Sequence, residues 1–109
     1  MASFSTLATA NTTGTSETTI VAAQGTKKAI NITHLSFSNT DTTNACNVTL
    51  KFGGVTKWDG IVVPAGLAHN FSFERPVRLD ANEALSFQSD ASVTTLYANV
   101  AYYLDPDAS

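Results

Sequence analysis

The feature that most constrains the fold is an alternation of apolar and polar residues, in short runs separated by turn signals. The clearest run is TLYANVAYYL (95–104), in which Leu96, Val100 and Leu104 fall on one side of an extended chain. A period of two residues predicts a β-strand with one face buried. No window of the chain has a helical period, so we expect strands throughout.

Runs of this kind recur at spacings of about 8 to 12 residues, giving seven to eight short strands, which is typical of an all-β sandwich. Gly53-Gly54 lies between two alternating runs and predicts a two-residue hairpin. Pro64 and Gly66 predict a second turn, and Asn82 is expected in the left-handed region in a third. The sequence therefore predicts an antiparallel β-sandwich, either a jelly roll or immunoglobulin-like.

The run INITHLSFSN (30–39) breaks the alternation at Thr33-His34. One extra residue there would turn Leu35 and Phe37 back toward the core, so we predict a β-bulge. The predicted core comprises Ile20, Ile30, Ile32, Leu35, Phe37, Val48, Leu50, Phe52, Val62, Phe71, Phe73, Leu79, Leu85, Phe87, Leu96, Val100 and Tyr102.

The organisation along the chain is predicted to be an extended N-terminal arm (1–16), a sandwich domain (17–105) and a short tail (106–109). Residues 1–16 contain two large apolar side chains, Phe4 and Leu7, and then a threonine-rich stretch without periodicity. Such a segment buries too little apolar surface to offset the entropy of ordering. We expect it to lie on a neighbouring subunit.

The net charge of −3 and a pI near 5.0 argue against binding to nucleic acid. No apolar run approaches the roughly 20 residues of a membrane-spanning helix. Charged residues make up only 14% of the chain, below the roughly 25% usual in soluble domains. A polar but weakly charged surface suits a protein that packs against other protein.

Catalytic and metal-binding patterns do not stand out. His34 and His69 have no metal-ligand spacing, and Cys46 lies within a predicted strand, where it more often packs as a small apolar group. The acidic residues fall mostly in predicted turns. We predict a protein that is not an enzyme and has no cofactor; a two-histidine site completed by Asp41, Asp59 or Asp80 stays open as the alternative.

Three aromatic residues have more than one interpretation. Trp58 either caps the end of the core or is exposed near a hairpin, and Tyr97 and Tyr103 fall on the outer side of the last strand. Exposed aromatic side chains concentrate at protein contacts, and on β-sandwiches they can also stack against sugars. The candidate protein interface is Phe4, Leu7, Trp58, Tyr97 and Tyr103.

Several motifs carry a resemblance to a known family. The strand INITHLSFSN, a polar loop, the strand VTL, the turn VPAG and the turn LDANEAL occur in this order before the last long strand. This arrangement, from about Thr18 to Tyr103, resembles the small all-β virion proteins of tailed bacteriophages.

The resemblance implies a virion structural protein, most simply a head decoration (cement) protein that binds between major capsid proteins. It also implies a homo-oligomer, with a trimer as the common form, located in the virion after assembly in the host cytoplasm. The alternatives are a tail or fibre-associated subunit and a carbohydrate-binding module that uses Trp58 or Tyr103.

Overall fold

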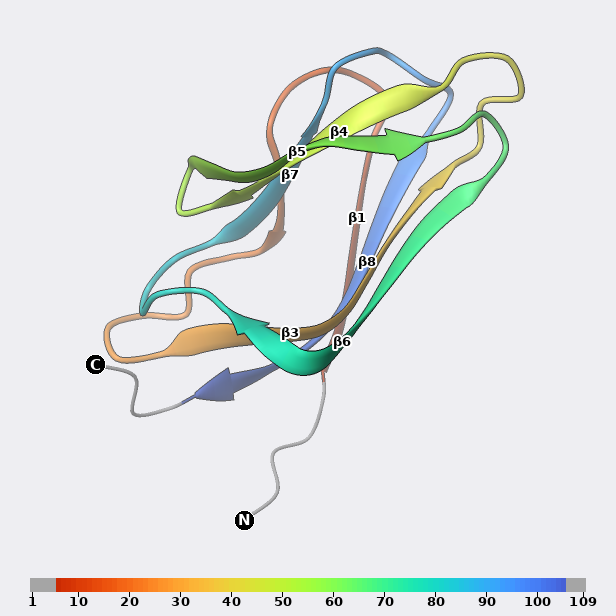
Figure 1. Ribbon diagram of the computed structural model, residues 1–109. Coiled ribbons are helices and arrows are strands. Elements are labelled where there is room, and N and C mark those ends of the chain that lie inside the picture. The colour runs from red at the N-terminus through yellow and green to blue at the C-terminus, as the bar shows by residue number, and fades with distance from the viewer. Residues whose placement is uncertain (1–5, 106–109) are drawn as a thin grey trace.

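The computed structural model describes residues 6–105, which form eight strands and no helix. The strands are β1 (Thr6–Thr12), β2 (Thr18–Val21), β3 (Ala29–Asn39), β4 (Cys46–Phe52), β5 (Val55–Val63), β6 (Ala68–Arg78), β7 (Leu85–Ser89) and β8 (Leu96–Asp105). They form two packed sheets (Figure 1). The prediction of an all-β sandwich is confirmed. Residues 6–105 include no helix able to cross a membrane.

The strand order identifies the type of sandwich. One sheet has the order β1-β8-β3-β6 and the other β2-β7-β4-β5, with antiparallel neighbours throughout. β4 and β5 form a hairpin, whereas every other connection between consecutive strands passes from one sheet to the other (Figure 1). This arrangement of eight strands is a jelly roll.

Strand β1 differs from the sequence prediction. Residues 6–12, placed in an arm on sequence grounds, pair with β8 from Thr6 opposite Tyr102 to Thr12 opposite Leu96 without a register shift. Ala8 and Ala10 pack against the core, and their small size hid this segment from a search for large apolar residues. The strand therefore belongs to the sandwich, and the other proposed arm residues that the structure describes, 13–16, lead into β2. Residues 1–5 and 106–109 lie outside the described residues.

The predicted bulge in β3 is confirmed. The register of β3 with β8 and with β6 shifts between Ile32 and His34. Thr33 is the extra residue opposite β8, and its hydroxyl donates to the carbonyl oxygen of Ala101 over 3.1 Å. Beyond the bulge, Phe37 again faces the core and is fully buried.

The predicted turns also appear. Gly53 and Gly54 have φ values of 60° and 83° and connect β4 to β5, as the hairpin signal requires. Asn82 has φ 62°, in the left-handed region expected for it. A Cβ added at Gly53 would lie 2.6 Å from the carboxylate of Glu83, which would have to move, while the positive φ already favours glycine here.

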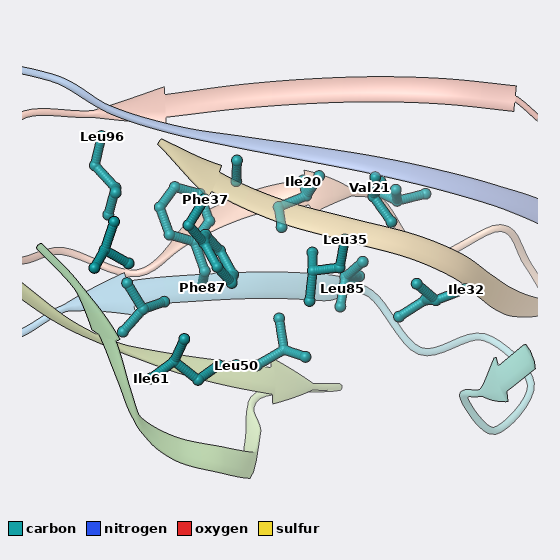
Figure 2. Close-up of a cluster of buried hydrophobic side chains, with 14 of the residues drawn as sticks. Ile20, Val21, Ile32, Leu35, Phe37, Leu50, Ile61, Leu85, Phe87 and Leu96 are labelled. Carbon is teal, nitrogen blue, oxygen red and sulfur yellow. The ribbon is translucent and has the colours of Figure 1, made fainter. Parts of the chain in front are cut away.

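The core lies between the two sheets (Figure 2). At its centre the rings of Phe37 on β3 and Phe87 on β7 approach with centroids 5.8 Å apart. Leu35, Leu50 and Leu85 surround them and are 1% exposed or less.

Four predicted core residues occupy other positions. Val62 is 51% exposed, while its neighbours Ile61 and Val63 are buried. The run of apolar residues there gives no alternation, and two register shifts between β4 and β5 move the inward face by one residue. Phe71, Phe73 and Tyr102 are half-buried and pack against the rim of the core.

The loop between β3 and β4 is held by two buried polar residues. Asn39 accepts a hydrogen bond from the backbone of Asp41 at 2.9 Å and donates to the carbonyl of Asn44 at 2.8 Å. The Asp41 carboxylate accepts backbone N–H bonds from Thr43 and Asn44 at 2.9 Å and from Thr94 at 3.2 Å. The hydrogen bonds from Thr43 and then Asn44 hold the pKa of Asp41 far below its usual value.

We predict that Phe37→Ala lowers the free energy of unfolding by roughly 3 to 5 kcal/mol, because it opens a cavity between the two central strands. His34→Gln is the control: this side chain is exposed beside the bulge, and we expect a change of about 0.5 kcal/mol or less. Urea denaturation of the two variants measures both values. A large loss at His34 with a mild one at Phe37 would contradict this description of β3.

Asp41 provides a pH-dependent prediction. Because its folded pKa lies well below the ordinary value of 3.8, the stability contributed by its ionised form is complete above that value and is lost as the pH falls below it. We expect the free energy of unfolding of the wild type to fall more than that of Asp41→Asn between neutral pH and about pH 3. Equal acid sensitivity of the two proteins would show that these hydrogen bonds contribute nothing.

Candidate interaction face

The outer surface of the sheet β1-β8-β3-β6 carries three rows of side chains without an aspartate, glutamate, lysine or arginine. We call this surface the neutral face. The register defines its rows as Asn11, Tyr97, Ser38 and Ala68; Thr9, Asn99, Ser36 and Asn70; and Leu7, Ala101, His34 and Ser72.

The neutral face is shallowly hollowed. A depression of about 380 Å³ lies over its middle, with Leu7, His34, Asn70 and Asn99 among its lining residues. Leu7 is 80% exposed at one side of it. An exposed leucine beside a shallow depression is an apolar contact point within a surface of short amides and hydroxyls.

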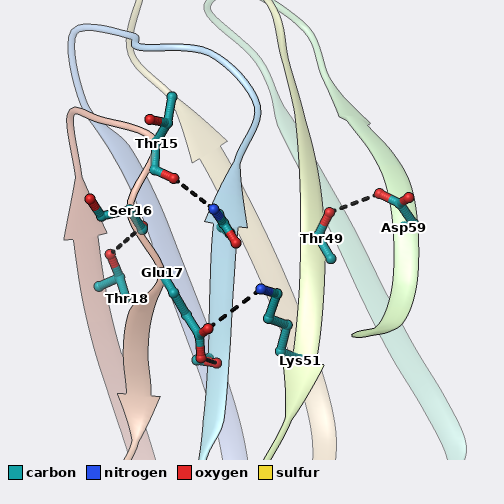
Figure 3. A network of polar contacts seen from close by, with 9 residues as sticks. Thr15, Ser16, Glu17, Thr18, Thr49, Lys51 and Asp59 are labelled. Atoms are coloured by element: carbon teal, nitrogen blue, oxygen red, sulfur yellow. Dashed lines mark hydrogen bonds and ion pairs between the residues drawn. The ribbon is translucent and has the colours of Figure 1, made fainter. Parts of the chain in front are cut away.

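Charged groups lie elsewhere: beyond the three rows on the same sheet, where Arg78 of β6 and Asp105 of β8 form an ion pair at 3.2 Å, and on the outer surface of the other sheet (Figure 3). Lys51 forms an ion pair with Glu17 at 3.4 Å, and the Ser86 hydroxyl donates to the other oxygen of Glu17 at 2.6 Å. The Ser86 bond, more than the nearby Lys51, lowers the pKa of Glu17. Thr49 donates to Asp59 at 2.8 Å on the same surface.

The structure separates the residues of the predicted interface. Leu7 and Tyr97, which is 42% exposed, lie on the neutral face. Tyr103 has the same parity along β8 as Tyr97 but lies beyond the three rows and is half-buried. Trp58 is on β5 in the other sheet, and Phe4 lies outside the described residues.

Trp58 belongs to an aromatic cluster where the edges of the two sheets meet. Its ring stacks on Phe73 with centroids 5.8 Å apart and on Phe71 at 6.4 Å, and it meets the edge of Phe52 at 6.4 Å. These contacts join β5 to β6 across the sandwich. They agree with the interpretation of Trp58 as a cap on the core, and they occupy ring surface that a sugar would need.

The residues considered for chemistry do not converge. His34 is exposed on β3. His69 lies opposite Phe37 in register, its Nδ1–H donates to the carbonyl oxygen of Val62 over 2.9 Å, and its ring stacks on Phe71 with centroids 4.5 Å apart. Burial raises the pKa of the Cys46 thiol, which makes it a poor nucleophile. Among residues 6–105, no three histidine, cysteine, aspartate or glutamate side chains gather as metal ligands would.

Sequence reasoning missed most of the neutral face. Ser36, Asn70 and Asn99 come from three strands, and each alone is an ordinary polar residue of a half-buried strand. Only the strand order brings them together. The signal available in the sequence was the lack of charge within these three rows, which becomes visible once the pairing of the strands is known.

Comparisons with known proteins give likeness of fold. No family model matches the chain, and no curated protein does. A chain of the acidic stable capsid structure of Helicobacter pylori bacteriophage KHP30 is similar, with a TM-score of 0.65 and 17% identity over 95% of this chain and 90% of that one. A chain of the Bacillus endospore appendages, a family of disulfide-linked pili, has a TM-score of 0.50 and 16% identity, covering 94% and 90%. At these identities the likeness shows the fold.

We predict that Trp58→Ala lowers the free energy of unfolding by about 2 to 3 kcal/mol, less than the roughly 3 to 5 kcal/mol of a fully buried aromatic residue. Tyr97→Ala, an exposed aromatic residue on the neutral face, should cost about 0.5 kcal/mol or less. Thermal or urea denaturation measures both. Equal small effects would contradict the capping role of Trp58.

Proposed function

We propose that this chain is a non-enzymatic structural protein of a tailed-bacteriophage virion, and specifically a capsid decoration protein that stabilises the head by binding between major capsid proteins. The observation that carries the proposal is the neutral face, whose three rows of side chains include no aspartate, glutamate, lysine or arginine. The protein would act in the virion, after assembly in the host cytoplasm.

The fold supports this proposal. The likeness to the phage capsid chain covers nearly all of both chains, so the whole sandwich is comparable rather than one motif within it. The similar chain of the endospore appendages also belongs to a surface assembly. Both neighbours are components of assembled structures, which is the setting we propose for this chain.

The chemistry of the neutral face supports it as well. Burying a charged side chain at an interface carries a large desolvation cost unless a partner is placed opposite it. Asn99, Ser36 and Thr9 carry only amides and hydroxyls, which can exchange water for backbone or side-chain groups of another protein at little cost. Leu7 adds an apolar contact. A flat protein surface, such as a capsid shell, fits these properties.

A charge at the centre of the neutral face tests the proposal. We predict that Asn99→Lys and Ser36→Lys weaken binding to purified heads that lack this chain by tenfold or more, since about 1.4 kcal/mol of lost binding energy is a factor of ten. Co-sedimentation at increasing protein concentration measures the change. Circular dichroism checks that the variants fold.

The matched control is Thr19→Lys, which places the same charge on an exposed position of the opposite sheet. It should bind heads as the wild type does. Unchanged binding by Asn99→Lys and Ser36→Lys would refute the docking face. Binding to tails but not to heads would replace the decoration role with a tail or fibre-associated one.

A further inference from the structure

The four edge strands of the sandwich are not equally protected against pairing with another chain. An edge strand exposes a row of backbone donors and acceptors, and proteins block such rows with charged residues, proline, bulges or very short strands. In this fold the edges are β1 and β6 of one sheet and β2 and β5 of the other.

Three of these edges carry such protection. β6 contains Pro76 together with Glu74 and Arg75, at the place where its register with β3 shifts. β5 carries Lys57 and Asp59 and has two register shifts against β4. β2 is four residues long and is irregular between positions 19 and 21.

Strand β1 has none of these features. Its seven residues, TLATANT, include no charged residue and no proline. Its register with β8 runs from Thr6 to Thr12 without a shift, so it is a regular strand. Within residues 6–105, β8 is the one strand that pairs with it, and no strand of its sheet is hydrogen-bonded to the opposite edge of β1.

We infer that the open edge of β1 is a self-association surface, where it pairs antiparallel with β1 of a second copy to join two sheets into one of eight strands. The partner strand is β1 itself, because among the edge strands of the described residues it is the one that is regular and uncharged. Copies of a chain with a net charge of −3 repel one another. An uncharged edge is where this repulsion opposes contact least.

The side chains of β1 are compatible with a two-fold pair. If the pair centres on Thr9, Leu7 faces Asn11 of the other copy, Ala8 faces Ala10, and Thr9 faces Thr9. Directly opposite residues share a face of the sheet, so the inner alanines meet alanines and the outer residues extend the neutral face across both copies. Opposed threonines are a favourable cross-strand pair. A two-fold axis makes the contact the same for both copies.

This inference does not depend on the proposed function, because it concerns the protein alone. A single strand contact lies at the small end of protein interfaces, so association should depend on concentration. Sedimentation velocity from about 1 μM to about 1 mM covers the range expected for a weak interface. We expect a monomer that becomes a dimer across that range.

Two opposite charges at Thr9 provide a sharp test. Thr9→Lys and Thr9→Glu each place like charges opposite one another in the pair, and each variant alone should stay monomeric at every concentration. An equal mixture of the two places opposite charges there and should dimerise at least as strongly as the wild type. A variant that failed to fold could not be rescued in this way.

Two controls carry the same charge elsewhere. Ser72→Lys lies on the neutral face at the other edge strand, and Asn99→Lys lies on the neutral face in β8, so both should dimerise like the wild type.

Amide hydrogen exchange of the wild type gives a second readout: amides of β1 should become more protected as concentration rises, while those of β6 do not change.

A wild type that stays monomeric up to about 1 mM would overturn the inference. So would Thr9 variants that associate as the wild type does, or a dimer that is lost in Asn99→Lys but kept in Thr9→Lys, because the contact would then be the neutral face itself. Loss of head binding in Asn99→Lys with dimerisation intact would separate the two surfaces.

Discussion

The apolar layer between the two sheets is the interaction on which the other features depend. Phe37 and Phe87 meet at its centre, and each comes from an inner strand of its own sheet. Because burying these side chains fixes which face of every strand points inward, it also fixes which residues point out. The neutral face, the outer surface of the sheet β2-β7-β4-β5 and the open edge of β1 are consequences of that choice. The bulge at Thr33 preserves it by returning the second half of β3 to the core.

Part of this structure could be predicted from the sequence, and the successful parts depend on local rules. The alternation in β8, the glycine hairpin at 53–54 and the slip at Thr33-His34 are each determined by neighbouring residues. The segment 6–12 was missed because Ala8 and Ala10 give a weak apolar signal, and its pairing with β8 spans almost the whole chain. In β5, adjacent apolar residues and two bulges conceal the inward register, so Val62 was chosen in place of Val63.

The candidate site was less predictable than the fold. Leu7 and Tyr97 were predicted as interface residues, and both lie on the neutral face. Trp58, predicted with them, stacks on Phe73 of the other sheet instead. The rest of the face is assembled from polar residues of four strands that are distant in sequence. Likewise, the loop that Asp41 organises depends on Thr94 from the connection between β7 and β8. Such sites arise from topology, and no single stretch of sequence contains them.

The two outer surfaces suggest how the domain would work in an assembly. The ion pair of Glu17 with Lys51 remains at the solvent side, where charged groups favour solubility. The neutral face would meet another protein without burying charge. The edge of β1 would then join neighbouring copies on the same surface.

Electron cryomicroscopy of capsids incubated with the purified protein tests the central claim most directly. The proposal predicts density for the sandwich at junctions between major capsid proteins, with the sheet β1-β8-β3-β6 turned toward the shell. Capsids without added density, or domains bound through the sheet β2-β7-β4-β5, would contradict it.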